Sequence, residues 1–327
     1  MSSKDSSLAP DYLTYPWRRH GYDHDRYAWS MLADRAPVQW PQGRTLAVWI
    51  NVSLQFYPLN QRGVPFKVPN GMTMPYPDLR HYSLRDYGNR VGIYRLLQAF
   101  ERFGVRPTWA INAQLAEQTP YLLERLKAFG GEFLCHGWNM DHLHTGGQDR
   151  DEEAEIVRRS VATLRALTGQ PVRGWLSPAK HQSWNTPDLL AENGIEYCAD
   201  WVNDELPYAF ATEAGELAMM PLTTEIEDQF VMAQNLHSED SWVEQVKDAF
   251  DFLVEESRRE GGRLLALNLH PWLVGQPHRI GCLEEVLAQG IVKPYYIGIT
   301  PPVLVQVYFF YREVSKFVVD LTGKNFP

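Results

Sequence analysis

Cysteine is scarce in this sequence, and the few cysteines do not suit a disulfide framework. The chain of 327 residues contains three, Cys135, Cys198 and Cys282. The first two fall in short apolar runs typical of buried strands, where a cysteine usually serves as a small core residue. We therefore expect free thiols and a reducing compartment.

Basic clusters and long apolar runs are missing as well. The 31 lysine and arginine residues are outnumbered by 40 aspartate and glutamate residues, which gives a net charge of −9. Nucleic acids and anionic membranes attract clustered positive charge, so we expect neither as a partner. The apolar run at residues 303–311 is too short to span a bilayer, and it follows two prolines.

An apolar segment is also missing from the beginning of the chain. The first residues, MSSKDSSLAP, are polar and lack the hydrophobic stretch of a secretory signal. This pattern predicts a cytoplasmic protein, and that location favours a small-molecule substrate over cell-wall polysaccharide. The sequence leaves open whether the chain forms a homo-oligomer.

The apolar residues that are present alternate between strand-like and helix-like patterns. They make up 44% of the chain, which is enough for a sizeable core. Short apolar runs predict buried strands, and longer segments with apolar residues three and four apart predict helices. The predicted strands are residues 44–52, 107–111, 132–135, 172–176, 195–199, 217–222 and 263–269; the predicted helices are 89–103, 119–130, 149–167, 186–194, 241–259 and 282–287. This alternation predicts one parallel α/β barrel or sheet.

The stretch from 102 to 147 shows this organisation most clearly. Its first helix ends at Gly104, a strand follows, and Thr119-Pro120 has the composition of a helix start. The second helix closes at Gly130-Gly131, and a short strand then leads directly to His136. In parallel β/α folds the carboxyl ends of the strands carry the chemistry, so His136 is a candidate functional residue.

Other polar residues follow predicted strands in the same way. His270 ends the strand at 263–269, and imidazole suits proton transfer near neutral pH. Asp200 and Asp204 follow the fifth strand and are candidates to act as a base or to orient a histidine. Lys180 follows the fourth strand, where a cation suits a developing oxyanion. The alternative for His270 is a structural histidine that caps the strand, and the alternative for one of the aspartates is a solvated loop acid.

Several of these segments resemble one known family. The stretch GVRPTWAINAQLAEQTPYLLERLKAFGGEFLCHGW and the pieces HGWNMDH, GWLSP, DWVNDELPY and LHPWLVGQPHR are similar to the polysaccharide deacetylase family, also called carbohydrate esterase family 4 or the nodulation-deacetylase homology domain. The resemblance runs from about residue 44 to 287 and is greatest to the cytoplasmic, allantoinase-like branch. It implies a distorted (β/α)7 barrel that hydrolyses non-peptide C–N bonds in N-acetyl sugars, ureides or cyclic amides.

The metal ligands of that family are not retained here. The family uses an Asp at the end of the first strand and two His four residues apart. His136 matches the first His, but Met140 stands at the second position, and residues 45–77 contain no Asp or Glu. A catalytic zinc needs about three protein ligands, so we expect no metal cofactor. The alternative is a relocated zinc site, for which the candidate ligands are His136, Asp141, His142 and His144.

The resemblance also implies roles for individual residues. His270 matches the family's histidine that protonates the leaving amine, and the other catalytic candidates are His136, Asp200 and Asp204. Aromatic rings near strand ends suit a flat or sugar ring. The candidate substrate-binding residues are Gln55, Arg90, Trp138, Lys180, Trp201 and Trp272.

Three regions and three functions are therefore predicted. Residues 1–43 form an extension that packs on the barrel, with about the first ten disordered; residues 44–289 form the catalytic domain; residues 290–327 form a C-terminal segment that does not match the family. The favoured function is a C–N hydrolase without the metal triad. The alternatives are a non-catalytic carbohydrate- or ureide-binding relative and a metal-dependent deacetylase with relocated ligands.

Overall fold

The computed structural model describes residues 24, 26–60, 77, 79–291 and 296–298. The predicted disorder of the first residues lies outside this part of the chain. So do most of the C-terminal segment and residues 61–76, which follow the first strand in the sequence.

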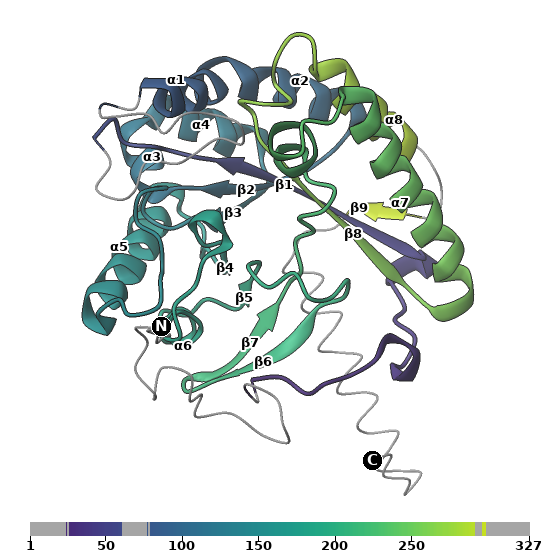
Figure 1. The fold of residues 1–327 in the computed structure, drawn as a ribbon, viewed down its shortest axis with the longest axis horizontal. Coiled ribbons are helices and arrows are strands. Elements are labelled where there is room, and N and C mark those ends of the chain that lie inside the picture. The colour runs from purple at the N-terminus through teal and green to yellow at the C-terminus, as the bar shows by residue number, and fades with distance from the viewer. Residues whose placement is uncertain (1–23, 25, 61–76, 78, 292–295, 299–327) are drawn as a thin grey trace, which may run out of the picture.

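One curled sheet forms the centre of the molecule (Figure 1). Its strand order is β6-β7-β5-β4-β3-β2-β1-β8, and β9 also pairs with β1. Every pairing is parallel except that of β6 with β7. The strands are β1 Leu46–Leu54, β2 Thr108–Ile111, β3 Glu132–Cys135, β4 Gly174–Trp175, β5 Tyr197–Cys198, β6 Tyr208–Thr212, β7 Gly215–Met219, β8 Arg263–Leu269 and β9 Tyr296–Gly298. The predicted distorted α/β barrel is confirmed, in the form of a half-closed sheet.

Helices surround the outer face of this sheet (Figure 1). They are α1 Leu79–Tyr87, α2 Ile93–Phe103, α3 Ala113–Gln118, α4 Pro120–Phe129, α5 Arg150–Thr168, α6 Thr186–Glu192, α7 Glu239–Glu260 and α8 Ile280–Ile291. A π-helical turn, Gly88–Gly92, joins α1 to α2. In the described part of the chain, no helix has both the length and the apolar character that a membrane crossing requires.

Strand β1 explains how the sheet separates a core from an active edge. All nine of its residues are buried. Leu46, Val48 and Ile50 pack in the cluster beneath the helices, whereas Ala47 and Trp49 pack in the smaller cluster on the inner face. Successive strand residues face opposite sides, so the polar residues that continue the second series face the interior of the barrel.

Local details correct the sequence prediction at several points. Helix α1, at residues 79–87, and strand β6 were not predicted from the sequence, and β6 pairs with β7 as a hairpin. Thr119 does not cap α4 with its side chain. Its hydroxyl donates instead to the carbonyl oxygen of Leu115, at 2.6 Å, in the last turn of α3.

The described part of the N-terminal extension contacts the barrel through specific polar pairs. Both guanidinium NH2 groups of Arg26 donate to the carboxylate of Asp188, each at 2.7 Å, in a buried ion pair with α6. Trp40 Nε1 donates to the carbonyl oxygen of Arg263 at 2.8 Å, at the beginning of β8. The extension is thereby attached both to helix α6 and to the beginning of β8.

Candidate active site

The register of the parallel strands brings several polar residues to one level. Leu54 pairs with Ile111, Ile111 with Cys135, and Cys135 with Trp175. The residues that follow these positions, Gln55, Asn112, His136 and Leu176, therefore stand together at the carboxyl edge. The Asn112 side chain links the segments that follow β1 and β3. Its amide nitrogen donates to the His136 carbonyl, and its oxygen accepts from the backbone N–H of Phe56.

His136 is held in one tautomer. Its Nδ1 lies 2.7 Å from the carbonyl oxygen of Leu176, which can only accept, so Nδ1 carries the hydrogen of the neutral ring. Burial lowers the pKa of His136 to about 4; the Leu176 hydrogen bond opposes this, and the charges of His270 and Lys180 add to it. Its buried Nε2 has no partner among the described residues. His136 therefore presents an unprotonated ring nitrogen at neutral pH.

His270 has a different partner. Its Nδ1 donates to Asp228 Oδ1 at 2.6 Å, and its backbone N–H donates to Asp228 Oδ2 at 2.8 Å. Asp228 is fully buried and also accepts from the backbone N–H of Gln229. Sequence reasoning missed Asp228, because this acid stands before a short π-helical segment and not at a strand end. The pair has the arrangement of a proton-transfer histidine oriented by a carboxylate.

Neutral groups occupy the strand ends where the family's metal acid would be expected. Asn51 Nδ2 and Ser53 Oγ each donate to Asn268 Oδ1 at 2.8 Å. Asn268 Nδ2 in turn donates to Glu227 Oε2 at 3.1 Å. Amide and hydroxyl groups that satisfy one another in this way are poor ligands for a divalent cation.

The four candidate ligands of a relocated metal do not converge. His144 Nδ1 pairs with Glu153 Oε1 at 2.9 Å in the core, and His142 Nδ1 lies 2.8 Å from Asn139 Oδ1. Within residues 24–298, as far as the structure describes them, no group of three or more His, Cys, Asp or Glu side chains is placed to hold a metal. The residues present therefore do not fit the family's metal.

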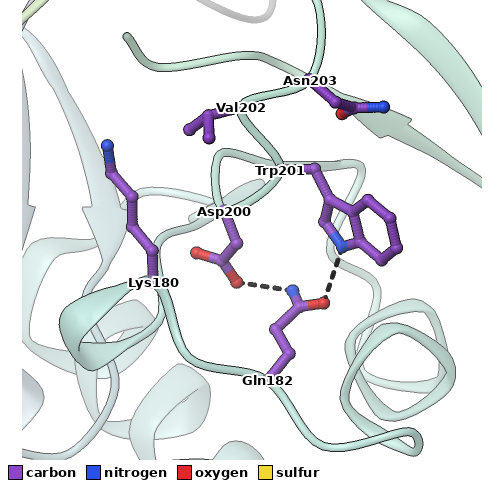
Figure 2. A pocket seen from close by; sticks show the side chains of 6 residues that line it. All are labelled: Lys180, Gln182, Asp200, Trp201, Val202 and Asn203. Atoms are coloured by element: carbon purple, nitrogen blue, oxygen red, sulfur yellow. Dashed lines mark hydrogen bonds between the residues drawn. The ribbon is translucent and has the colours of Figure 1, made fainter. Parts of the chain in front are cut away.

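A pocket of about 390 Å³ opens beside the ends of β4 and β5. Figure 2 shows Lys180 on one side, Trp201 on the other and Asp200 between them. The other residues that line it are Gln182, Val202 and Asn203. Trp201 Nε1 donates to Gln182 Oε1 at 2.9 Å, and the Trp201 ring also meets the Phe210 ring at a centroid distance of 5.1 Å, so this wall of the pocket is held in place.

Asp200 belongs to this pocket and is enclosed by donors. Its Oδ1 accepts from the backbone N–H of Ser177 at 2.7 Å, and its Oδ2 accepts from Gln182 Nε2 at 2.5 Å. Burial raises the pKa of Asp200, while these hydrogen bonds oppose the rise. A buried carboxyl with a raised pKa beside a cation is typical of functional sites.

The other predicted residues divide between the site and its surroundings. Gln55 is buried at the end of β1, and its Oε1 has no partner in the described chain. The ring centroid of Trp272 lies 6.2 Å from that of His270, and its buried Nε1 has no partner among the described residues. The Trp138 ring is covered by the Arg159 guanidinium at 3.6 Å, away from the pocket lining.

Asp204 and Arg90 have structural partners. Asp204 Oδ1 and Oδ2 accept from the two guanidinium NH2 groups of Arg35, at 2.8 and 2.7 Å, so its carboxylate anchors the N-terminal extension. The Arg90 side chain is 75% exposed and pairs with Asp86 at 3.1 Å across one helical turn. The geometry therefore gives neither residue a position at the histidine pair.

Part of the chain is similar in sequence to known deacetylases. Residues 82–198 match the family model described as polysaccharide deacetylase. A Schizosaccharomyces pombe protein, provisionally named a polysaccharide deacetylase, is 26% identical over 65% of this chain and 73% of its own length. A Helicobacter pylori peptidoglycan deacetylase is 27% identical over 37% of this chain and 41% of its own.

Two solved structures have the same fold. A Pseudomonas aeruginosa PAO1 protein, also provisionally named a polysaccharide deacetylase, superposes with a TM-score of 0.75 at 25% identity, covering 85% of this chain and 95% of its own. The Puue allantoinase superposes with a TM-score of 0.76 at 23% identity, covering 87% and 98%. The chain therefore contains a polysaccharide deacetylase domain, matched over residues 82–198, and is a polysaccharide deacetylase-like hydrolase.

Proposed function

We propose that this protein hydrolyses a non-peptide C–N bond in a small N-acetylated sugar, ureide or cyclic amide, without the family's metal triad. The observation that carries the proposal is the His270–Asp228 pair at the carboxyl edge of β8, with a Nδ1–Oδ1 distance of 2.6 Å. A buried carboxylate fixes this histidine, and neutral asparagine and serine groups stand where the metal acid would be.

The pair can move the proton that amide hydrolysis requires. Because Nδ1–H of His270 donates to Asp228, Nε2 keeps the lone pair of the neutral ring. Nε2 takes a proton from water as the water oxygen attacks the carbonyl carbon. The imidazolium, stabilised by Asp228, then gives this proton to the leaving nitrogen as the C–N bond breaks.

The unpartnered atoms of the site support a substrate rich in N–H groups. His136 Nε2 and Gln55 Oε1 are buried acceptors that no described residue satisfies. Buried polar atoms without partners are costly, so they usually meet a ligand or water. An acetamide, a ureide and a cyclic amide each carry N–H donors that suit these acceptors. The names of the solved relative and of the curated relatives, allantoinase and deacetylase, fall in the same reaction class.

Turnover assays on a panel of compounds test this function. The panel consists of acetamido sugars, allantoin and cyclic imides, each assayed with the wild type, with His270→Gln and with Met140→Leu. We expect turnover of at least one compound and a fall in kcat of about 10²- to 10⁴-fold for His270→Gln. Met140→Leu should act like the wild type, because a thioether moves no proton.

Two outcomes would oppose the proposal. Full activity in His270→Gln would remove the assigned proton carrier. Binding of a compound from the panel without turnover would favour the non-catalytic alternative instead.

A further inference from the structure

Among the described residues, Lys180 is a cation that lines the pocket beside the ends of β4 and β5. Its Nζ donates to the carbonyl oxygen of Leu222 at 2.9 Å and to Thr224 Oγ1 at 2.6 Å. The carboxylate of Glu227 lies 3.6 Å away, beyond a normal hydrogen bond. An ammonium group has three N–H donors, so one of them makes only this long contact.

The backbone at Lys180 and at the residue before it adopts a strained, left-handed conformation. Ala179 and Lys180 have φ angles of 57° and 54°, in the left-handed region that residues with a Cβ seldom adopt. The turn is closed by hydrogen bonds from Lys180 N to the Ser177 carbonyl and from His181 N to the Pro178 carbonyl. Backbone strain of this kind is concentrated at functional sites.

Glu227 connects the lysine to the residues that replace the metal acid. One oxygen of this carboxylate, Oε2, faces both Lys180 Nζ and Asn268 Nδ2. Asn268 in turn accepts from Asn51 and Ser53 of β1. The network therefore runs from the end of β1, through β8, to a single ammonium group that lines the 390 Å³ pocket (Figure 2).

We propose that the Lys180 ammonium group supplies the fixed positive charge of this site and polarises the carbonyl of the scissile amide. The inference rests on the proposed function and extends it by naming the group that stabilises the negative charge on the carbonyl oxygen. The ammonium group donates a hydrogen bond to the carbonyl oxygen, whose negative charge grows as water adds to the carbon. No bond to Lys180 forms, and the proton is carried by His270. The lysine charge also contributes to the low pKa of His136, which agrees with a position beside that ring.

Kinetic comparison of lysine variants tests the role. With a compound turned over by the wild type, Lys180→Met should lower kcat by about 10²- to 10³-fold with little change in KM, and Lys180→Arg should retain most of the activity. Propylammonium ions should partly restore Lys180→Ala, which a purely structural role would not produce. Lys127→Met is the matched control, because Lys127 pairs with Glu124 on α4, outside the site. Wild-type kcat in Lys180→Met would overturn the proposal.

Removing the lysine alone leaves Glu227 buried without its cation, so folding is controlled separately. The double variant Lys180→Met with Glu227→Gln removes both charges and keeps an amide beside Asn268. Its circular dichroism spectrum and thermal transition should resemble those of the wild type. Its kcat should stay as low as that of the single variant; recovery to wild-type turnover would contradict the role.

A binding measurement separates failure of this inference from failure of the proposed function. Carbon-13 acetate is a small anion that should bind the Lys180 N–H whose described contact is the long one to Glu227. Its exchange broadening is measured by NMR and needs no turnover. We expect broadening with the wild type and Lys180→Arg but not with the double variant. If no compound is hydrolysed, the proposed function fails while acetate still tests the lysine. Equal broadening by the double variant would refute the cation site.

Discussion

Three histidines of this chain differ chiefly in the group that Nδ1 meets. His136 Nδ1 meets a backbone carbonyl, whereas His270 and His144 meet the carboxylates of Asp228 and Glu153. His144 is enclosed in the core, but His270 stands at the strand edge. The same residue type therefore presents a buried acceptor atom at His136, the proposed proton carrier at His270 and a structural group at His144, according to its partner and its place.

The contrast between the two histidine–carboxylate pairs gives a direct test. Asp228→Asn should lower kcat by about 10²- to 10⁴-fold, because an amide fixes the tautomer poorly and does not stabilise the imidazolium. Glu153→Gln is the matched control and should change stability but leave kcat within about threefold. Steady-state kinetics and urea unfolding of both variants check this. Equal loss of kcat in the two would argue for general unfolding.

Glu132 predicts a dependence of stability on pH. Burial raises the pKa of this carboxyl from 4.5 to about 8, while the Tyr197 hydrogen bond and the Arg173 charge oppose the rise. Between these two pKa values the folded protein keeps a proton on Glu132 that the unfolded chain releases. The free energy of unfolding therefore falls as pH rises from about 4.5 to about 8. The unfolding free energy of Glu132→Gln should rise by roughly 3–5 kcal/mol relative to that of the wild type across this pH window.

Urea unfolding at several pH values measures this difference. Glu124→Gln, at an exposed position of α4, should follow the wild-type curve. If the gap between Glu132→Gln and the wild type does not change with pH, the carboxyl is ionised in the folded protein and the prediction is wrong.

At the scale of elements, the π-helical turn Gly88–Gly92 packs directly on the segment that follows His270. A Cβ at Gly88 would lie 2.6 Å from the backbone nitrogen of Trp272, and a Cβ at Gly92 would overlap the carbonyl oxygen of Pro271. The turn thereby supports the loop that leaves β8. Two glycines are required here because two backbones approach closely.

Adding a methyl group at this contact should move the loop. Gly92→Ala should cost about 2 kcal/mol or more of unfolding free energy, since backbone atoms cannot yield as a side chain would, and kcat should fall with it. Gly281→Ala is the control, because no atom lies within 4 Å of its Cβ position in α8, and it should be neutral or stabilising by up to about 1 kcal/mol. Thermal unfolding of the two variants distinguishes them.

The ion pair between the extension and the pocket wall makes a second prediction at this scale. Arg35→Ala should lower the unfolding free energy by about 1–2 kcal/mol, because the two-fold hydrogen-bonded pair with Asp204 is only partly exposed. Asp204→Asn should keep kcat within about threefold. Asp200→Asn, inside the pocket, should reduce kcat/KM by at least about tenfold. A large loss of kcat in Asp204→Asn alone would restore it as a catalytic candidate.

At the scale of the whole molecule, the curled sheet collects residues distant in sequence at one edge. Asn51, His136 and His270 lie on three different strands or strand ends, and their order in the chain says little about their separation. The parallel register places them together, and the helices close the outer face. A site of this kind depends on the complete sheet.

Metal analysis and metal removal test whether the protein depends on a bound metal. We expect elemental analysis to find less than one zinc per chain, and we expect treatment with a strong chelator to change neither the melting temperature nor turnover. The reason is the neutral network at Asn51, Ser53 and Asn268, together with Met140 at the position of the second histidine. One tightly held metal per chain, with activity lost on its removal, would favour the relocated-metal alternative.

The sequence by itself determined most of the elements and the edge at which the site lies. Periodic apolar residues and the glycines at helix ends predicted the alternation of strands and helices, because these signals are local. They also predicted His136 and His270 as strand-end residues. The loss of the metal acid was instead inferred from the family resemblance, because residues 45–77 contain no Asp or Glu. Both histidines occupy buried positions at the carboxyl edge.

The tertiary structure alone decided which groups meet. Asp228 is 42 residues from His270, and Arg35 is 169 residues from Asp204. No periodicity records such pairs, because they arise from strand order and loop packing. Asp204 was a catalytic candidate and pairs with Arg35 of the extension, whereas Asp228 gave no signal in the sequence and hydrogen-bonds His270. The identity of a candidate residue is local, but its partner, its burial and hence its chemistry depend on the fold.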